Sequence, residues 1–220
     1  MTATAPRPTP TVLPGSRLAA WAGVAFFVLF PVGVLFSSND LDGSDSDAKW
    51  HDWFADSGHR TNNIIGIYAL VIAAILFVVF AAGLLERLRV GDAPSMLHRV
   101  AAGTGILFAG LTMVAAIQLG GISGNIAFGD NPVPKDADIM RQTLGYGTLA
   151  VAGALTALAF IVVITPLAQA AGLFPRWLVI VSYIAAVLLL GAAVFLPLAA
   201  LPIWVLIVSI VLMRGRQPAG

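Results

Sequence analysis

SSNDLDGSDSDAKWHDWFADSGHR, residues 37–60, is a long polar segment between two strongly apolar stretches of the chain. It carries six aspartates against only Lys49 and Arg60. An acidic block of this kind cannot lie in hydrocarbon, because removing unpaired charges from water is too costly. We therefore expect the segment to lie in water on one side of a membrane. Its position then determines, by alternation, the side on which every other loop lies.

The composition is that of a polytopic membrane protein. Of the 220 residues, 59% are hydrophobic and 10% are charged, and the mean hydropathy is +0.91. Soluble domains carry about 25% charged residues. The basic residues are scattered along the chain, which gives no basic patch for nucleic acid. The absence of cysteine excludes disulfides, thiolate nucleophiles and cysteine metal sites.

Long apolar runs predict an all-α bundle of six transmembrane helices within residues 17–214. Two polar segments, 37–61 and 123–142, are expected to be outer loops. The Pro- and Thr-rich residues 1–16 are expected to form a disordered cytoplasmic tail, and 215–220 a second tail. The predicted spans are 18–36, 62–85, 99–122, 143–168, 177–194 and 199–213.

Two parts of this assignment have alternatives. The first span could be a signal peptide, but its apolar core is longer than the usual h-region of about 7–15 residues. We expect an uncleaved helix bent at Pro31. The run 177–213 is barely long enough for two spans, and Pro197 and Pro202 mark where a hairpin would turn. Five spans, with a long broken last helix, is the alternative.

The distribution of charge favours six spans. With six, both termini and two short loops share one side, which collects eight arginines against Glu86 and Asp92. The other side collects four basic residues against nine aspartates. The positive-inside rule places the arginine-rich side in the cytoplasm. The arginines are Arg7, Arg17, Arg87, Arg89, Arg99, Arg176, Arg214 and Arg216.

Small residues recur at helical spacing on the second, third and fourth spans, which is typical of close helix packing in lipid. These stripes predict a tight core of these three helices, with the first helix and the last hairpin around it. Leu, Ile, Val and Phe on the other faces are expected to meet lipid. The stripes contain Asn62, Gly66, Ala69 and Ala73; Ala101, Gly105, Ala109, Thr112 and Ala116; and Gly145, Thr148, Ala152, Thr156 and Ala159.

Apart from Arg99, which stands at the edge of the third span, no Asp, Glu, Lys, Arg or His falls inside a predicted span. Ionisable residues at membrane depth mark proton relays, ion paths and catalytic sites, so this pattern argues against those functions. Uncharged polar groups remain within the spans. Thr104 and Gln118 share one helical face and, with Tyr146, would line a cavity for a lipophilic or neutral ligand. The alternative is that they form hydrogen bonds between helices.

The acidic segment offers two patterns with metal chemistry. Residues 40–47 alternate carboxylates around Gly43, as calcium loops do, but Lys49 stands where the bidentate Glu is required. On a continuous helix, Asp52, Asp56 and His59 would share a face and could hold zinc. The alternative is an amphipathic helix lying on the membrane, with its aromatic residues at headgroup level. Those aromatic residues are Trp50, Trp53 and Phe54.

Two segments resemble a large group of uncharacterised actinobacterial integral membrane proteins, some known only as domains of unknown function. One is WFADSGHRTNNIIGIYALVIAAILFVVFAAGLLERLR (53–89), an aromatic-Ala-Asp-x-x-His-Arg entry into the second span. The other is GLFPRWLVIVSYIAAVLLL (172–190), a Pro-Arg-Trp entry into the fifth. The resemblance implies a six-helix fold and a plasma-membrane location. It implies no catalytic residues.

These features together lead us to expect a non-enzymatic accessory or scaffold subunit of a membrane complex, with no cofactor. Its partners would be the lipid bilayer and another membrane protein or a second copy of itself. A carrier or binder of a lipophilic or neutral molecule within the bundle is the first alternative. A metal-dependent enzyme that uses the outer loop is the second.

Overall fold

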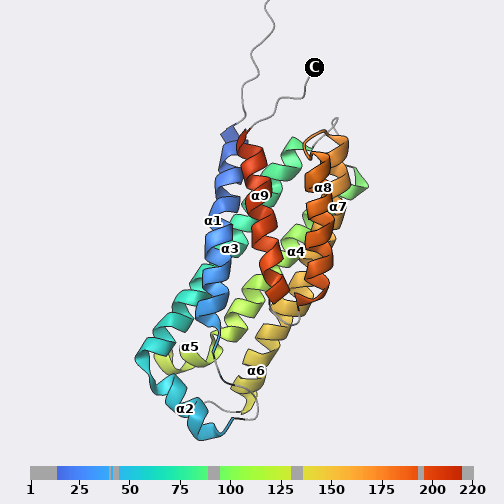
Figure 1. Cartoon of the computed structure of the whole chain (residues 1–220). Coiled ribbons are helices and arrows are strands. Elements are labelled where there is room, and N and C mark those ends of the chain that lie inside the picture. Colours follow the sequence, from blue (N-terminus) through green and yellow to red (C-terminus); the bar gives the residue numbers. More distant parts are fainter. Residues whose placement is uncertain are drawn as a thin grey trace, which may run out of the picture.

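The computed structural model describes residues 14–39, 41, 45–88, 95–129, 136–192 and 196–214, and these residues form helices and turns without any strand. The helices pack side by side into an elongated bundle (Figure 1). In chain order they are α1 (Pro14–Ser37), α2 (Asp47–Ala55), α3 (Ser57–Arg87), α4 (Met96–Leu119), α5 (Gly121–Phe128), α6 (Asp136–Gly147), α7 (Ala154–Ala170), α8 (Arg176–Leu190) and α9 (Ala200–Arg214).

Five helical stretches are long and apolar enough to cross a membrane: Arg17–Ser37, Ser57–Arg87, Met96–Leu119, Asp138–Ala170 and Pro197–Arg214. They correspond to five of the six predicted spans. The remaining prediction, 177–194, falls on α8, which is apolar but has only 15 residues. A helix of this length rises about 22 Å, less than the roughly 30 Å of a bilayer core.

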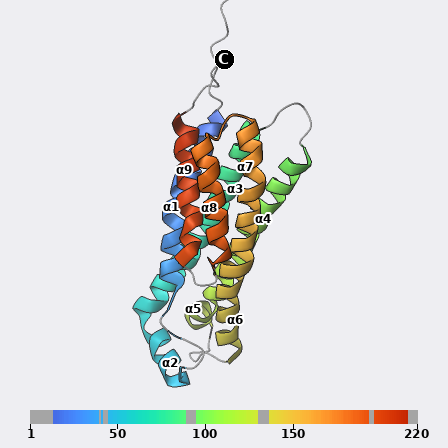
Figure 2. The same cartoon turned by 45° about the vertical axis from the view of Figure 1, so that its right-hand side comes forward.

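The C-terminal apolar run folds as two helices and not as one broken helix. Helix α8 ends at Leu190, and α9 begins at Ala200 after a 3₁₀ turn at Leu196–Ala199. The two helices contact each other, and α8 also packs on α7 (Figure 1, Figure 2). Helix α9 returns to the end of the bundle at which α1 begins (Figure 1).

Helices α1 and α3 form the most extensive helix pair of the described residues. Buried positions on both recur with alternating spacings of three and four, which is the heptad pattern of helices packed at about +20°. Side chains pair in antiparallel order, because Phe26 contacts Phe77 and Gly33 faces Leu70. The buried positions that follow this pattern are Ala19, Gly23, Phe26, Phe30, Gly33 and Ser37 on α1, and Asn63, Gly66, Leu70, Ala73, Phe77, Phe80 and Leu84 on α3. Ala20 and Ala22 on α1 and Ala69, Ala74 and Ala81 on α3 are buried as well.

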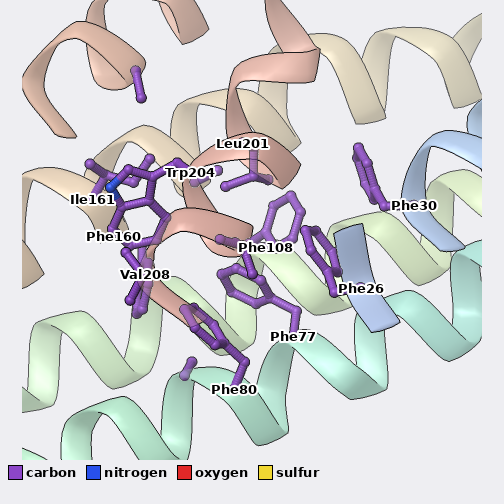
Figure 3. Close-up of a cluster of buried hydrophobic side chains, with 14 of the residues drawn as sticks. Phe26, Phe30, Phe77, Phe80, Phe108, Phe160, Ile161, Leu201, Trp204 and Val208 are labelled. Carbon is purple, nitrogen blue, oxygen red and sulfur yellow. The ribbon is translucent and has the colours of Figure 1, made fainter. Parts of the chain in front are cut away.

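Aromatic rings fill the centre of the bundle (Figure 3). Phe77 lies 4.6 Å from Phe108 and 5.4 Å from Phe160 between ring centroids, and both pairs are edge-on. Edge-on pairs of this kind contribute about 0.5–1.5 kcal/mol beyond burial. The expectation that phenylalanine would face lipid is therefore wrong for the buried set. The buried phenylalanines of the spanning helices are Phe26, Phe30, Phe77, Phe80, Phe108 and Phe160.

The predicted packing stripes are buried in part. Gly66, Gly105, Ala109, Thr112 and Gly145 are buried, whereas Ala152 and Thr156 are only half-buried. On the second span the prediction is wrong for Asn62, which is exposed, whereas the neighbouring Asn63 is buried.

The expected peripheral position of the first helix is wrong. A side-chain carbon at Gly66 would stand 2.5 Å from the backbone nitrogen of Ser37, so here α1 and α3 approach almost to backbone contact. Helix α1 is thus part of the core.

Both predicted outer loops contain helices. Helix α2 lies in the first, and α5 with the start of α6 lies in the second. Trp50 and Phe54 of α2 pack with Ile122 of α5 in a small apolar cluster apart from the main core. We call α2, α5 and residues 136–142 the cap. It closes the end of the bundle opposite Arg214 (Figure 1).

A π-helical segment, Thr148–Gly153, joins α6 to α7 within one continuous helical stretch. Single π-helical turns of this kind are rare and occur frequently at functional sites. Leu149, Ala150 and Gly153 are buried in it. The segment lies where the cap meets the bundle.

The contact at Gly66 predicts the outcome of a substitution. Gly66→Ala would push a methyl group into the backbone of Phe36 and Ser37, which a side-chain rotation cannot relieve. We expect it to destabilise the fold by about 1–3 kcal/mol, seen as a lower unfolding temperature in detergent.

Gly103→Ala in α4 is the matched control, because nothing lies within 4 Å of the added carbon. It should leave stability unchanged or raise it by up to about 1 kcal/mol through helix propensity. Equal effects of the two substitutions would contradict the proposed contact.

Candidate functional site

The motif W-F-A-D-S-G-H-R, residues 53–60, forms the corner between α2 and α3. Asp56 separates the two helices in extended conformation, and its Oδ1 accepts from the backbone N–H of Gly58 at 2.6 Å and of His59 at 3.1 Å. It is the N-cap of α3. These hydrogen bonds, that of His59 first and that of Gly58 second, lower the pKa of Asp56 below its usual value.

Arg60 fastens the other side of the corner. Its guanidinium donates to the backbone carbonyls of Phe54 and Ala55, the latter at 2.7 Å. These are among the last carbonyls of α2, which receive no hydrogen bond from an N–H group of their own helix. A basic side chain at this end also complements the helix dipole. Arg60 is therefore engaged with the backbone.

His59 folds back over α2. Its ring stacks on that of Trp53, with centroids 4.5 Å apart and planes 14° from parallel. His59 Nδ1 lies 3.1 Å from the carbonyl oxygen of Trp53. Because a carbonyl oxygen can only accept, Nδ1 carries the hydrogen, and the neutral ring then offers Nε2 as an acceptor.

The predicted metal site at Asp52, Asp56 and His59 is not formed. Within the described part of the chain, no three His, Asp or Glu side chains come together in a way that could hold a metal ion. The prediction assumed one continuous helix, but α2 ends at Ala55 and Asp56 turns its carboxylate to cap α3. The alternative placed the aromatic residues of α2 at headgroup level, and for Trp50 and Phe54 it is wrong, because both are buried inside the cap.

The predicted calcium pattern lies largely outside the described residues, at Asp40 and Asp42–Ser44. At its described end, Asp45 pairs with Lys49 at 2.7 Å.

Thr104, Gln118 and Tyr146 do not meet in one cavity. The Thr104 hydroxyl donates to carbonyls of its own helix. Gln118 Oε1 accepts from Thr148 at 3.1 Å, which links α4 to the π-helical segment. The Tyr146 hydroxyl donates to the carbonyl of Ser37 at 3.3 Å and accepts from Asn39 N at 3.2 Å. For Gln118 and Tyr146 the alternative of bonds between elements is confirmed.

A polar pocket of about 260 Å³ opens beside the corner. It lies between the end of α1, the residues that follow it, and the α2–α3 junction. Asn39 contributes a side-chain amide whose Oδ1 accepts from Leu41 N, while its Nδ2 is buried without a hydrogen-bond partner among the described residues. The lining residues are Leu35, Phe36, Ser38, Asn39, Trp53, His59 and Asn62.

An apolar groove of about 330 Å³ adjoins this pocket. It runs between α1 at Pro31 and the turn before α9, on a surface that would face lipid. Leu35, which is 68% exposed, lines both the groove and the polar pocket. The groove is lined by Phe30, Pro31, Val34, Leu35, Leu198, Ala199 and Pro202. Together, groove and pocket form a site with an apolar half and a polar half, which we call the amphipathic site.

Sequence reasoning missed the amphipathic site. Its signals were the two prolines that line the groove, Pro31 and Pro202, and the uncharged amides Asn39 and Asn62 near the two ends of the acidic segment. Two more buried polar residues were missed in the cap. Ser123 and Gln142 have side-chain polar atoms without partners in the described part of the chain, and neither lines the polar pocket.

Comparison with protein-family models, curated proteins and solved structures finds no match to this chain. The architecture is that of a multi-pass helical membrane protein. The resemblance to actinobacterial membrane proteins stays a prediction.

The corner predicts a dependence on Asp56. Asp56→Ala should loosen the α2–α3 junction, whereas Asp56→Asn, which keeps a capping oxygen, should preserve it. Because folding lowers the pKa of Asp56, its contribution is complete above the unfolded pKa of about 4 and is lost as the pH falls through the folded value. Hydrogen exchange of the Gly58 and His59 amides measures both effects. Unchanged protection in Asp56→Ala would contradict the capping role.

Proposed function

We propose that the chain crosses a bacterial plasma membrane six times, with both termini in the cytoplasm and the cap outside. The arginine-rich ends of the spans support this orientation through the positive-inside rule. Helix α8 and the turn after it would form the short fifth crossing. The antiparallel hairpin of α8 and α9 supports an even number of crossings (Figure 1).

The absence of cysteine makes this topology directly testable. Single cysteines at Ser57, Ala170 and Met213 would all be exposed. A membrane-impermeant maleimide should label Ser57→Cys in intact cells, and Ala170→Cys and Met213→Cys only after lysis. Labelling of Met213→Cys from outside would instead indicate five crossings.

We further propose that the protein binds an amphiphilic lipid of the outer leaflet and is not an enzyme. The observation that carries this proposal is the amphipathic site, in which an apolar groove on α1 and α9 continues at Leu35 into a polar pocket. The groove is lined by two stretches long enough to span the membrane, and the pocket lies at the end of α1. An acyl chain in the groove would place its headgroup in the pocket.

Filling the groove tests the proposal. Ala199 is exposed and lines the groove, so Ala199→Trp would occupy the space of several methylene groups. Each buried methylene contributes about 0.8 kcal/mol, so losing two would weaken lipid binding about tenfold or more. Native mass spectrometry of the purified protein with added lipid measures the bound fraction.

Ala82→Trp is the matched control, since Ala82 is exposed on the long apolar helix α3 and does not line the groove. Equal retention of lipid by both variants would overturn the proposal.

A role as accessory or scaffold subunit is a second proposal, supported by Phe128. This residue ends α5 in the cap, outside the spanning stretches, and is 90% exposed. A large apolar side chain exposed to water is a favourable anchor for a protein partner. Phe128→Ser should abolish co-purification of such a partner from the native host while leaving lipid binding unchanged.

A further inference from the structure

We propose that the polar half of the amphipathic site selects an uncharged headgroup rich in hydroxyls, such as a sugar. This inference rests on the proposed lipid binding and adds the chemical class of the headgroup. It follows from the charge, the hydrogen-bonding capacity and the position of the residues that line the pocket.

The pocket offers no fixed charge to a ligand. Its lining contains no Lys, Arg, Asp or Glu among the described residues. The charged groups beside it are already engaged, since Arg60 donates to two carbonyls of α2 and Asp56 accepts from two amides of α3. A phosphate would therefore lose its water without gaining a basic partner, which is a large penalty for a charged group.

Donors and acceptors are mixed in the lining. The buried Asn39 Nδ2 is a donor without a partner among the described residues, and Asn62 presents both a donor and an acceptor. His59 offers Nε2 as an acceptor, because its Nδ1 is held by the Trp53 carbonyl. A hydroxyl both donates and accepts, so adjacent hydroxyls match such a lining. A phosphate oxygen only accepts, and a quaternary ammonium does neither.

The position of the pocket links this headgroup to a lipid. Leu35 and Phe36 form its apolar edge, and both are exposed on the spanning helix α1. Ser38, Asn39 and Asn62 form its polar edge just beyond the apolar stretch. A molecule that fills both halves of the amphipathic site must be amphiphilic.

The test is competitive native mass spectrometry of the full chain in detergent, with lipids of identical acyl chains. The probes are monohexosyl diacylglycerol, phosphatidylglycerol and phosphatidylcholine. We expect the hexosyl lipid to bind at least about fivefold better than either phospholipid, as one or two net hydrogen bonds would give.

Two variants assign the preference to the pocket. Asn39→Asp keeps the Oδ1 acceptor and removes the buried donor, and His59→Phe keeps a ring on Trp53 and removes the acceptor. Each should reduce hexosyl lipid binding about fivefold. His59→Phe should leave phosphatidylcholine binding unchanged, and Asn39→Asp should not weaken it, because the added carboxylate attracts the quaternary ammonium. His51→Phe in α2, which does not line the pocket, is the matched control and should change neither.

The outcomes separate this inference from the proposed function. No preference for the hexosyl lipid, with all lipids still weakened by Ala199→Trp, would overturn the headgroup assignment and leave the proposed lipid binding standing. No effect of Ala199→Trp on any lipid would overturn the proposed lipid binding. If methyl hexoside displaced the hexosyl lipid at equal concentration, the ligand would be a soluble sugar and not a lipid.

Discussion

The close approach of α1 and α3 is the contact on which the rest of the structure depends. At Gly66 the two backbones lie so close together that a side-chain carbon would not fit between them. In a membrane, where lipid is as apolar as leucine, such close packing supplies the attraction between helices. The same contact brings the end of α1 to Asn63, whose Nδ2 donates to the carbonyl of Ser37 at 3.2 Å. Asn39, which lines the polar pocket, follows Ser37 by two residues.

Five of the six predicted spans and the sites of the polar segments could be predicted from the sequence, because hydrocarbon excludes charge and favours long apolar runs. The partnership of α1 and α3 could not. In a membrane protein the outward face is as apolar as the core, so hydropathy does not distinguish Phe26, which is buried, from Val28, which is exposed. Only the spacing of the glycines and phenylalanines, which lie alternately three and four residues apart, indicated that α1 and α3 pack together.

The corner at residues 53–60 shows a different limit. The motif was visible, but its interpretation as one helical face was wrong, since Asp56 ends one helix and caps the next. Asp followed by Ser and Gly is a common helix start, and this signal could have separated the two helices. The motif therefore has a structural explanation through Asp56, His59 and Arg60. The prolines and amides of the amphipathic site were visible in the sequence. That they form one site could not be predicted, because the site joins α1 to α9 across most of the chain.

The π-helical segment Thr148–Gly153 has a consequence for how this chain tolerates insertions and deletions. A π-helical turn holds an extra residue compared with an α-helical one. Deleting one residue there would restore a regular α-helix and leave the faces of α6 and α7 almost unchanged, because the π-helical turn already absorbs the extra residue. Deleting a residue elsewhere between α6 and α7 would instead rotate the two helices by about 100° and carry Tyr146 away from the carbonyl of Ser37. The segment is thus the position at which this stretch can lose one residue while the cap keeps its orientation on the bundle.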